Sequence, residues 1–596
     1  MGLGLGVGCG PGDATMRDPA AALRVPSRAT TEQENLEAFA RLYGYVRWFH
    51  PTDAAARANW RVLAATGIAS VREAEDLGEL REALQEHFGP LAPRLELWLD
   101  GEPPPDDEPA PDPKRAVYWQ HEGYVGTRLS LYSPPYGQVR VGKDGPYRRR
   151  FAQAPDPDTR VQTQLLPGLH LRLPTVLTAA DAEHDGDVST SWDDELAHAA
   201  VSAHGWKQLD VRQGAVVEVW NVLRHFYPYQ DTVPIDFDAL LVEALHDAQD
   251  DASVDDVAGT LWRLVHALQD GHGMVGHREL AARGQLPLRV ELIEGEPVVT
   301  GTADPEHFAV GDVIESIDGV PLLPRVHALT ERLSGSPQWR RFRAASWEAL
   351  AGPRDAAVPI TVRSGKRSHT ETARYDAAAP PVPPRPPALH RFDDGTWYVD
   401  LTRAHWQDLE PALPELALAP GVVFDMRGYP TDTHRILAHL MAVEEDAQWM
   451  HVPRVLEPDG HVAGWGPIGW HIRPAEPQIP GKRAFLIDAE AISYAESVLG
   501  YVEAHDLGPL VGSPTAGANG DIVRVDTLGG FYVVFTGMKV THHDGRRLHG
   551  DGIAPNIAVT PTRAGLRAGK DEVLQAGLAQ VRDRRIARAP RPRADR

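Results

Sequence analysis

Apolar residues recur at three- and four-residue spacing in two stretches of the chain. The first covers about 31–94 and contains NLEAFARLYGYVRWF, and the second covers 211–284. This spacing is the period of an amphipathic helix. Thr31 and Glu34 also resemble a capping box, which marks a helix start. The sequence therefore predicts two helical segments.

Short apolar or alternating runs between Pro- and Gly-rich turns follow each helical segment and predict strands. Residues 95–210 combine the Pro-rich GEPPPDDEPAPDP with AVYWQH, RLSLYS and LHLRLP, which predicts a β-rich module. Residues 285–380 carry LPLRVEL, EPVVTG, GDVIESIDGVPL and VPITVRS. The run at 311–319 is similar to the carboxylate-binding region of a PDZ module, and a plain hairpin with an Asp-Gly turn is the alternative.

The last stretch, 388–585, alternates strands with helices. Its strand candidates are TWYVDL, GVVFDMRG, AFLIDAE, GPLVGS and GFYVVFTG, and SYAESVLGYVEAH predicts a helix between the third and the fourth. Such alternation favours a mainly parallel sheet covered by helices.

Length and charge narrow the class of protein. A chain of 596 residues is too long to fold around one hydrophobic core, so we expect several domains. The net charge of −23 argues against nucleic acid or an anionic membrane surface as the main partner, because both need clustered Lys and Arg.

The first 30 residues are predicted to be a leader. MGLGLGVGCGPGDAT places small apolar residues before Cys9, the single cysteine, as at the end of a lipoprotein signal. A Gly-rich leader without structure is the alternative. The first interpretation predicts an extracytoplasmic protein of the bacterial periplasm or cell envelope, with a membrane tether through a lipid on Cys9.

Several common enzyme motifs are missing from the sequence. The chain has no Gly-x-Ser-x-Gly, no His-Glu-x-x-His, no phosphate loop and no dinucleotide fingerprint. We interpret the doublet His542-His543 as a polar turn rather than a metal site. The sequence thus predicts neither a metal nor a cofactor.

Three segments carry candidate chemistry. In LWRLVHALQDGHGMVGH, His272 follows a helix end and is free to act as a general base. In GVVFDMRGYP, Gly428 follows a buried strand, where its N–H could meet a substrate carbonyl. Ser493 stands at the predicted start of a helix, where an oxyanion is stabilised and the Tyr494 N–H is a second donor. Ser493 as a simple helix N-cap is the alternative.

The order of these motifs resembles a known peptidase family. Asp-Gly-His after a helix, Gly-Asp-x-Ile-x-x-Ile-Asp-Gly, Asp-x-Arg-Gly after a strand, and Ser-x-Ala-Glu before Leu-Val-Gly-x-x-Thr-x-Gly occur in sequence over about 211–575. Asp-Gly-Ile-Ala-Pro-Asn at 551–556 closes the set. This order is similar to that of the C-terminal-processing (tail-specific) proteases and of their tricorn-core branch.

The resemblance implies a role for each matching residue. It makes Ser493 the nucleophile and the N–H groups of Gly428 and Tyr494 the oxyanion donors. Ala518 stands where the tail-specific branch has its lysine base, so the tricorn-like pattern applies, with His272 as the base. Asp551 is then the candidate for the orienting carboxylate, and His549 is a nearby alternative.

The sequence therefore predicts a serine peptidase that acts on protein or peptide substrates through a Ser/His/carboxylate acyl-enzyme mechanism. A non-catalytic protein that binds a peptide or an apolar ligand on the same scaffold is the alternative, and an esterase is a third. The predicted fold is a multidomain α+β chain with a C-terminal α/β (ClpP/crotonase-like) catalytic domain. Its predicted parts are a leader at 1–30, a helical segment at 31–94, a β-rich module at 95–210, a helical segment at 211–284 that ends at the candidate catalytic His, a PDZ-like module at 285–380 and the catalytic domain at 388–585.

Overall fold

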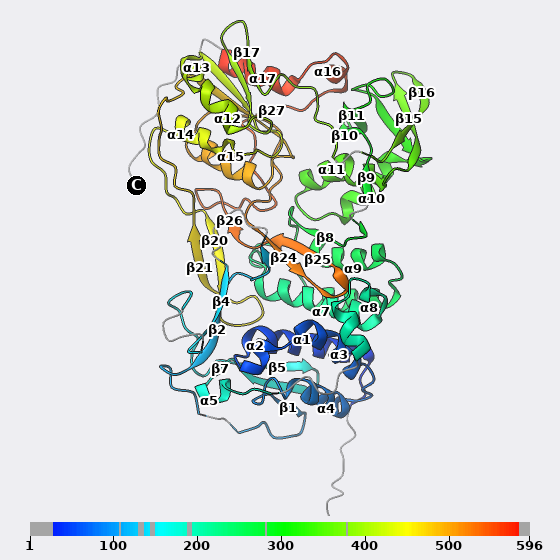
Figure 1. Cartoon of the computed structure of the whole chain (residues 1–596), viewed down its shortest axis with the longest axis vertical. Coiled ribbons are helices and arrows are strands. Elements are labelled where there is room, and N and C mark those ends of the chain that lie inside the picture. Colours follow the sequence, from blue (N-terminus) through cyan, green and yellow to red (C-terminus); the bar gives the residue numbers. More distant parts are fainter. Residues whose placement is uncertain are drawn as a thin grey trace, which may run out of the picture.

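The computed structural model describes residues 28–106, 109–128, 136–143, 149–186, 194–280, 283–376 and 379–582. The chain is a multidomain mixed α/β protein with several sheets (Figure 1). Cys9 and most of the leader lie outside the described residues. No helix in the described ranges is long and apolar enough to cross a membrane.

Helices from both predicted helical segments pack against one another in the lower half of Figure 1, where the first segment is blue and the second is teal to green. They are α1 (Glu32–Phe49), α2 (Asp53–Arg57), α3 (Trp60–Arg72), α4 (Leu77–Phe88), α7 (Leu209–Phe226), α8 (Phe237–Asp250) and α9 (Val254–Ala267). The capping box is confirmed, because the Thr31 side chain accepts the Glu34 N–H and the Glu34 side chain accepts the Thr31 N–H.

The strands of 95–210 do not all stay together. β1 (Glu96–Leu99), β5 (Arg160–Leu166) and β6 (Leu169–Pro174) form one antiparallel sheet. β2 (Val117–Glu122), which pairs with β4 (Gly137–Val141) and β7 (Val176–Leu177), joins a sheet with β20 (Met450–Val455), β21 (Val462–Ile468) and β26 (Lys539–Val540). Short helices α5 (Ala179–Ala182) and α6 (Asp194–Val201) follow in the chain. This part of the chain is therefore paired with segments more than 300 residues later.

The antiparallel sheet of residues 288–374, which we call the second sheet unit, has a core of its own. It is built from β10 (Leu288–Ile293), β11 (Glu296–Thr302), β12 (Val313–Ile317), β15 (Ala357–Ser364) and β16 (Arg367–Arg374), with β13 (Val320–Pro321) at β12. Helices α10 (Leu322–Arg332) and α11 (Pro337–Ser346) contact it, and β9 (Arg283–Gln285) pairs with β14 (Ala351–Pro353) beside it. The PDZ-like character of this unit stays a prediction.

The C-terminal region contains the predicted parallel sheet. Its strand order is β17 (Leu389–Arg391), β18 (Trp397–Asp400), β19 (Gly421–Asp425), β22 (Lys482–Ile487), β23 (Leu510–Gly512) and β27 (Ile557–Ala558), parallel except at β17. Helices α12 (Trp406–Leu409), α13 (Leu413–Leu418), α14 (Leu437–Leu440), α15 (Tyr494–Ala504), α16 (Arg563–Arg567) and α17 (Glu572–Arg582) belong to the same region.

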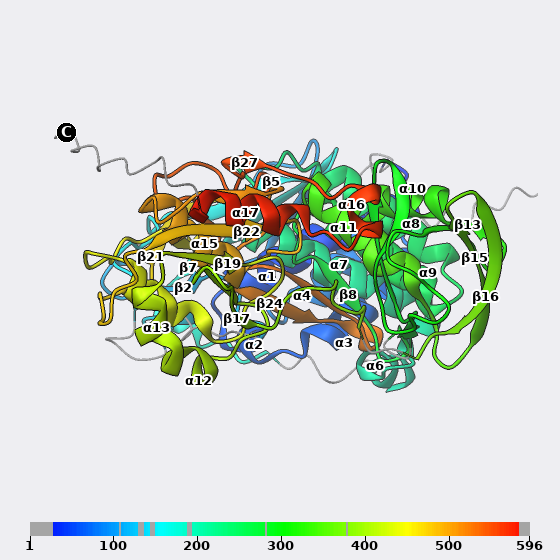
Figure 2. The same cartoon turned by 90° about the horizontal axis from the view of Figure 1, so that it is seen from above.

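Each face of this sheet is covered by a helix. On β19, Phe424 shares a core cluster with Val498 of α15, whereas Val423 shares one with Leu578 of α17. Figure 2 shows α17 lying along β22. Strands buried on both faces read as continuous apolar runs, which explains why GVVFD and AFLI were recognisable.

One predicted strand lies elsewhere. GFYVVFTG forms β25 (Tyr532–Thr536), which pairs antiparallel with β24 (Ile522–Asp526) and with β8 (Met274–Gly276), and β3 (Thr127–Arg128) pairs with β24. A short strand can pair with any free edge, and here the partner is supplied by the segment that follows His272. This pairing brings His272 to the C-terminal region.

Candidate active site

Ser493 lies between a strand of the parallel sheet and the helix α15. β22 ends at Ile487, and Ser493 takes the N-cap position with φ +58° and ψ −113°. A positive φ is uncommon outside glycine and marks a sharp, strained turn. The Ser493 side chain makes no capping hydrogen bond to the first turn of α15. The capping interpretation therefore does not account for this serine.

The buried carboxylate of Glu496 anchors the loop that contacts the Ser493 turn. It accepts the Thr515 hydroxyl at 2.5 Å and the N–H groups of Gly517 and Ala518 at 2.8 and 2.9 Å. Burial raises the pKa of Glu496 to about 7, although these hydrogen bonds act in the opposite direction. The Ser493 N–H in turn donates to the Ala518 carbonyl at 2.8 Å. Glu496 thus joins the serine turn to the loop 515–518.

His272 lies in a network that starts from a second buried carboxylate. Asp270 is fully buried and accepts the Thr536 N–H at 2.6 Å, the Thr536 hydroxyl at 2.8 Å and the His272 N–H at 3.0 Å. The Nδ1 of His272 lies 2.8 Å from the Thr536 hydroxyl and 3.8 Å from Asp270. Its Nε2 is buried and has no hydrogen-bond partner among the described residues.

The environment of His272 favours the neutral imidazole. Burial lowers its pKa, the Asp270 carboxylate opposes this, and the neighbouring His549 lowers the pKa further. A neutral ring at neutral pH is the form that can accept a proton.

The histidine and serine segments meet at Ala518. A Cβ placed on Gly271 would stand 2.7 Å from the Ala518 Cβ, so the two backbones approach closely because Gly271 has no side chain. Trp339 of α11 donates its indole N–H to the Gly271 carbonyl at 2.9 Å. The predicted nucleophile and base thus belong to segments that contact the same residue, and Ala518 itself is buried.

The two predicted oxyanion donors are placed differently. Tyr494 opens α15 directly after Ser493, where backbone N–H groups point out of the helix start. Gly428 has φ +138°, and its N–H donates to the Met426 carbonyl at 3.0 Å. Gly428 would have to exchange that bond to serve an oxyanion. Burial raises the pKa of the Tyr429 side chain beside it, and an interaction with the Ser493 side chain opposes this rise.

The loop that carries Gly428 is anchored by charged side chains. Asp425 is buried and pairs with Arg427 at 2.6 Å, and Arg427 also reaches Asp571 at 2.7 Å. Tyr398 donates to Asp425 at 2.8 Å. Burial alone would raise the pKa of Asp425, but Arg385 and Arg427 lower it well below its usual range. The Asp-x-Arg pair is thus a structural support for the loop.

Asp551 is not at His272 in this structure. Its half-exposed carboxylate pairs with Arg547 at 2.6 Å. His549 is buried, stacks on Tyr229 at 4.0 Å and has its Nε2 3.3 Å from the Tyr227 hydroxyl. The carboxylate nearest to His272 in the network is that of Asp270, and the role of Asp551 stays a prediction.

A polar cavity of about 350 Å³ lies beside these groups. It is lined by Gln269 near the histidine turn, by Ser336 and Arg340 of the second sheet unit, and by His549 and Asp551. The cavity therefore lies where the helical, second-sheet and C-terminal parts of the chain meet.

Part of the chain is similar to known proteins. Residues 398–559 match the model of peptidase family S41. Among solved structures, the chain is similar to mature CPAF complexed with lactacystin (13% identity, 60% of this chain and 95% of that chain, TM-score 0.49). It is also similar to the photosystem II D1 C-terminal processing protease (15%, 60% and 96%, 0.39) and to the tricorn protease (13%, 62% and 36%, 0.34). No curated protein matches the sequence. Identities this low describe a distant likeness, and the similarity to family S41 is limited to the match over 398–559.

Sequence reasoning missed three groups around the predicted residues. Asp270 belongs to the Asp-Gly-His motif, but the motif does not indicate that its carboxylate supports His272. Thr536 carries no local signal, because its role depends on the pairing of β25 with β8. Tyr429 follows the Gly428 turn and was passed over as a loop residue.

Proposed function

We propose that this protein is a serine peptidase that cleaves protein or peptide substrates, with Ser493 as nucleophile and His272 as general base. The observation that carries the proposal is the convergence of the two segments at Ala518, with the Nε2 of His272 buried and unpartnered among the described residues. The family match over 398–559 supports the reaction class.

The hydrogen bonds around Thr536 support the base role of His272. A threonine hydroxyl has one hydrogen, and that of Thr536 is donated to Asp270. Its oxygen is then the acceptor for a proton on Nδ1 of His272, 2.8 Å away. This leaves the lone pair on Nε2, which is the tautomer that a base needs. Asp270 acts here through Thr536 as a positioning residue.

The reaction follows from these roles. Nε2 of His272 takes the hydroxyl proton of Ser493 while the oxygen attacks the substrate carbonyl. The tetrahedral oxyanion is stabilised by the Tyr494 N–H and by the Gly428 N–H once it leaves the Met426 carbonyl. The C–N bond breaks as the imidazolium gives its proton to the leaving amine. Water, deprotonated by His272, then hydrolyses the acyl-enzyme and frees Ser493.

Hydrolysis of peptides tests this proposal. A panel of peptide and ester substrates is offered to the full chain, to Ser493→Ala and to Ser497→Ala as a matched control one helical turn further along α15. The proposal expects peptide cleavage that is lost in Ser493→Ala and kept in Ser497→Ala. Cleavage of esters alone would make the protein an esterase.

A non-catalytic binding protein on the same scaffold is the second candidate. It is favoured by one observation, which is that the Gly428 N–H is already bonded to Met426. Retention of a peptide on the folded protein with no cleavage by the intact chain would favour it.

We further propose that the protein acts outside the cytoplasm, tethered through Cys9, and finding it in the soluble cytoplasmic fraction of its own cells would contradict this.

A further inference from the structure

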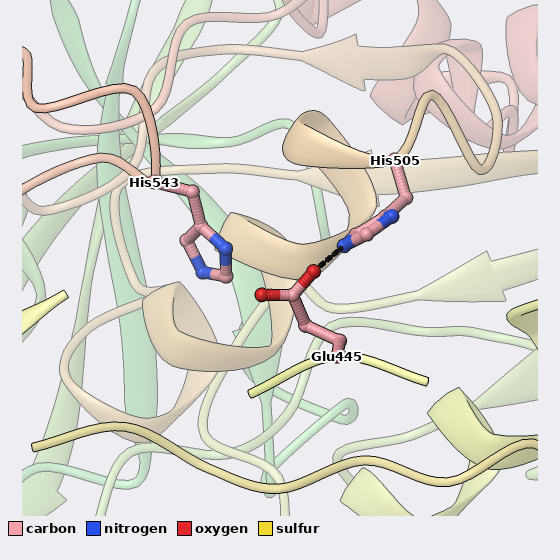
Figure 3. A group of neighbouring side chains, drawn as sticks. All are labelled: Glu445, His505 and His543. Carbon is pink, nitrogen blue, oxygen red and sulfur yellow. Dashed lines mark ion pairs between the residues drawn. The ribbon is translucent and has the colours of Figure 1, made fainter. Parts of the chain in front are cut away.

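Three side chains with metal-binding chemistry gather at the far end of α15, away from Ser493. Glu445, His505 and His543 each offer a ligand atom, and these atoms lie within 4.8 Å of one another. Figure 3 shows the carboxylate of Glu445 between the two imidazole rings. The His505 Nε2 lies 2.8 Å from a Glu445 oxygen. The three residues come from separate segments of the C-terminal region.

The backbone holds each of these residues in place. Glu445 exchanges two hydrogen bonds of 2.9 Å with Ile472. His505 is the C-cap of α15, and its N–H donates to Tyr501 at 3.1 Å. His543 lies in a turn after β26, and its ring lies next to Gly500 of α15, where an added Cβ would be in van der Waals contact with Nε2 at 3.5 Å. The site is thus assembled from fixed backbone positions.

The ring of His543 lacks hydrogen-bond partners. Both its nitrogens are buried, and neither has a partner among the described residues. The ring stacks on Trp449 at 5.2 Å and meets Tyr501 edge-on at 4.6 Å. The adjacent His542 points elsewhere, with its Nδ1 2.5 Å from Glu503. Buried polar atoms without partners cost free energy, and a bound ion would satisfy them.

We propose that Glu445, His505 and His543 bind a divalent cation of the zinc class. Two imidazoles and one carboxylate are a ligand set that Zn²⁺ uses, with the fourth position open to water. Zinc–ligand bonds of about 2.0–2.2 Å place neighbouring ligand atoms roughly 3.3 Å apart. The most widely separated ligand atoms would therefore close by up to about 1.5 Å on binding. The His505 Nε2 and the Glu445 oxygen would move apart by about 0.5 Å, as bonds to the ion replace their direct contact.

The proposed ion has a positioning role. It would join the C-terminal end of α15 to the segment before β20 and to the turn after β26. The helix rises about 15 Å from Tyr494 to Ala504 at 1.5 Å per residue, so the ion does not reach Ser493. This site revises the interpretation of the His542-His543 doublet as a plain polar turn, and it is independent of the proposed peptidase mechanism.

Metal binding by the full chain tests the site. Chelator-treated protein is titrated with Co²⁺, whose visible absorption reports its coordination, and with Zn²⁺ while the melting temperature is followed. The variants are His543→Gln and Glu445→Gln, and His542→Gln is the matched control. Circular dichroism without metal checks that each variant is folded.

We expect the intact chain and His542→Gln to bind one equivalent of Co²⁺ with tetrahedral-type absorption. Zn²⁺ should raise their melting temperature by about 2 °C or more. In His543→Gln and Glu445→Gln the affinity should fall at least about tenfold, and the thermal shift should disappear. Absence of binding to the intact chain, or equal binding by folded His543→Gln, would overturn the proposal. If His543→Gln does not fold, equal metal binding by folded Glu445→Gln would overturn the proposal in the same way.

Discussion

Gly271 and Ala518 lie so close that a Cβ added to Gly271 would stand 2.7 Å from the Cβ of Ala518. Real Cβ atoms do not approach this closely, so Gly271→Ala must displace either the His272 turn or the loop that holds Ser493. We expect peptidase activity to fall more than about tenfold, because small displacements of a catalytic group cost about that much or more. Gly259 of α9 has open space at its Cβ, and Gly259→Ala should leave kcat/KM unchanged. Equal activity of the two variants would contradict the tight contact.

The buried imidazole of His272 should set the pH dependence of the reaction. Burial lowers the pKa of His272, although Asp270 opposes this, and the neutral ring is the active form. Activity should therefore rise with pH along an acidic limb whose midpoint lies below pH 6.5, the ordinary histidine value. Thr536→Val removes the acceptor for Nδ1–H and should lower kcat, whereas Thr536→Ser should retain it. A kcat/KM profile shows both effects, and a midpoint above 6.5 would contradict the buried neutral histidine.

Asp270 and Asp551 compete for the role of the carboxylate behind His272. The structure places Asp270 in the His272–Thr536 network and pairs Asp551 with Arg547. We therefore expect Asp270→Asn to lower kcat about 100-fold or more, by disturbing the tautomer of His272, and Asp551→Asn to have a smaller effect. Melting temperatures separate loss of fold from loss of activity. A larger loss in Asp551→Asn would restore the assignment that the resemblance implies.

Glu496 should contribute strongly to stability. Replacing it with Ala leaves the buried donors of Thr515, Gly517 and Ala518 without an acceptor, at roughly 1–3 kcal/mol each. Urea unfolding of Glu496→Ala should show a loss of about 3 kcal/mol or more. The exposed Glu415 lies 3.7 Å from Arg391, and Glu415→Ala should change stability by less than about 1 kcal/mol. Similar losses in both variants would show that the loop does not depend on Glu496.

Local sequence patterns predicted the parts of the site that depend on nearby residues. The buried runs before Asp425 and Ser493 are strands because both faces of the sheet are covered, and the turn after each strand is encoded within a few residues. The start of α15 at Ser493 followed from the same local pattern.

The remaining features depend on contacts across the chain. Thr536 and Asp270 are 266 residues apart in the sequence, and they form a hydrogen bond only because β25 pairs with β8. The hydrogen bond from the Gly428 N–H to the Met426 carbonyl depends on the backbone conformation of this loop, which the residue types alone do not specify. No metal-binding sequence spacing links Glu445, His505 and His543. Their side chains come together only through the packing of α15 against the segments around it.

Labelling with a fluorophosphonate probe, followed by mapping of the modified peptide, tests the central claim most directly. The account predicts modification of Ser493 in the intact chain and in Ser497→Ala, because an activated serine reacts with such probes. It predicts none in Ser493→Ala and little in His272→Ala, provided that both remain folded by circular dichroism. A folded intact chain that is not labelled, or labelling at another serine that persists in Ser493→Ala, would contradict the assignment of Ser493 as the nucleophile.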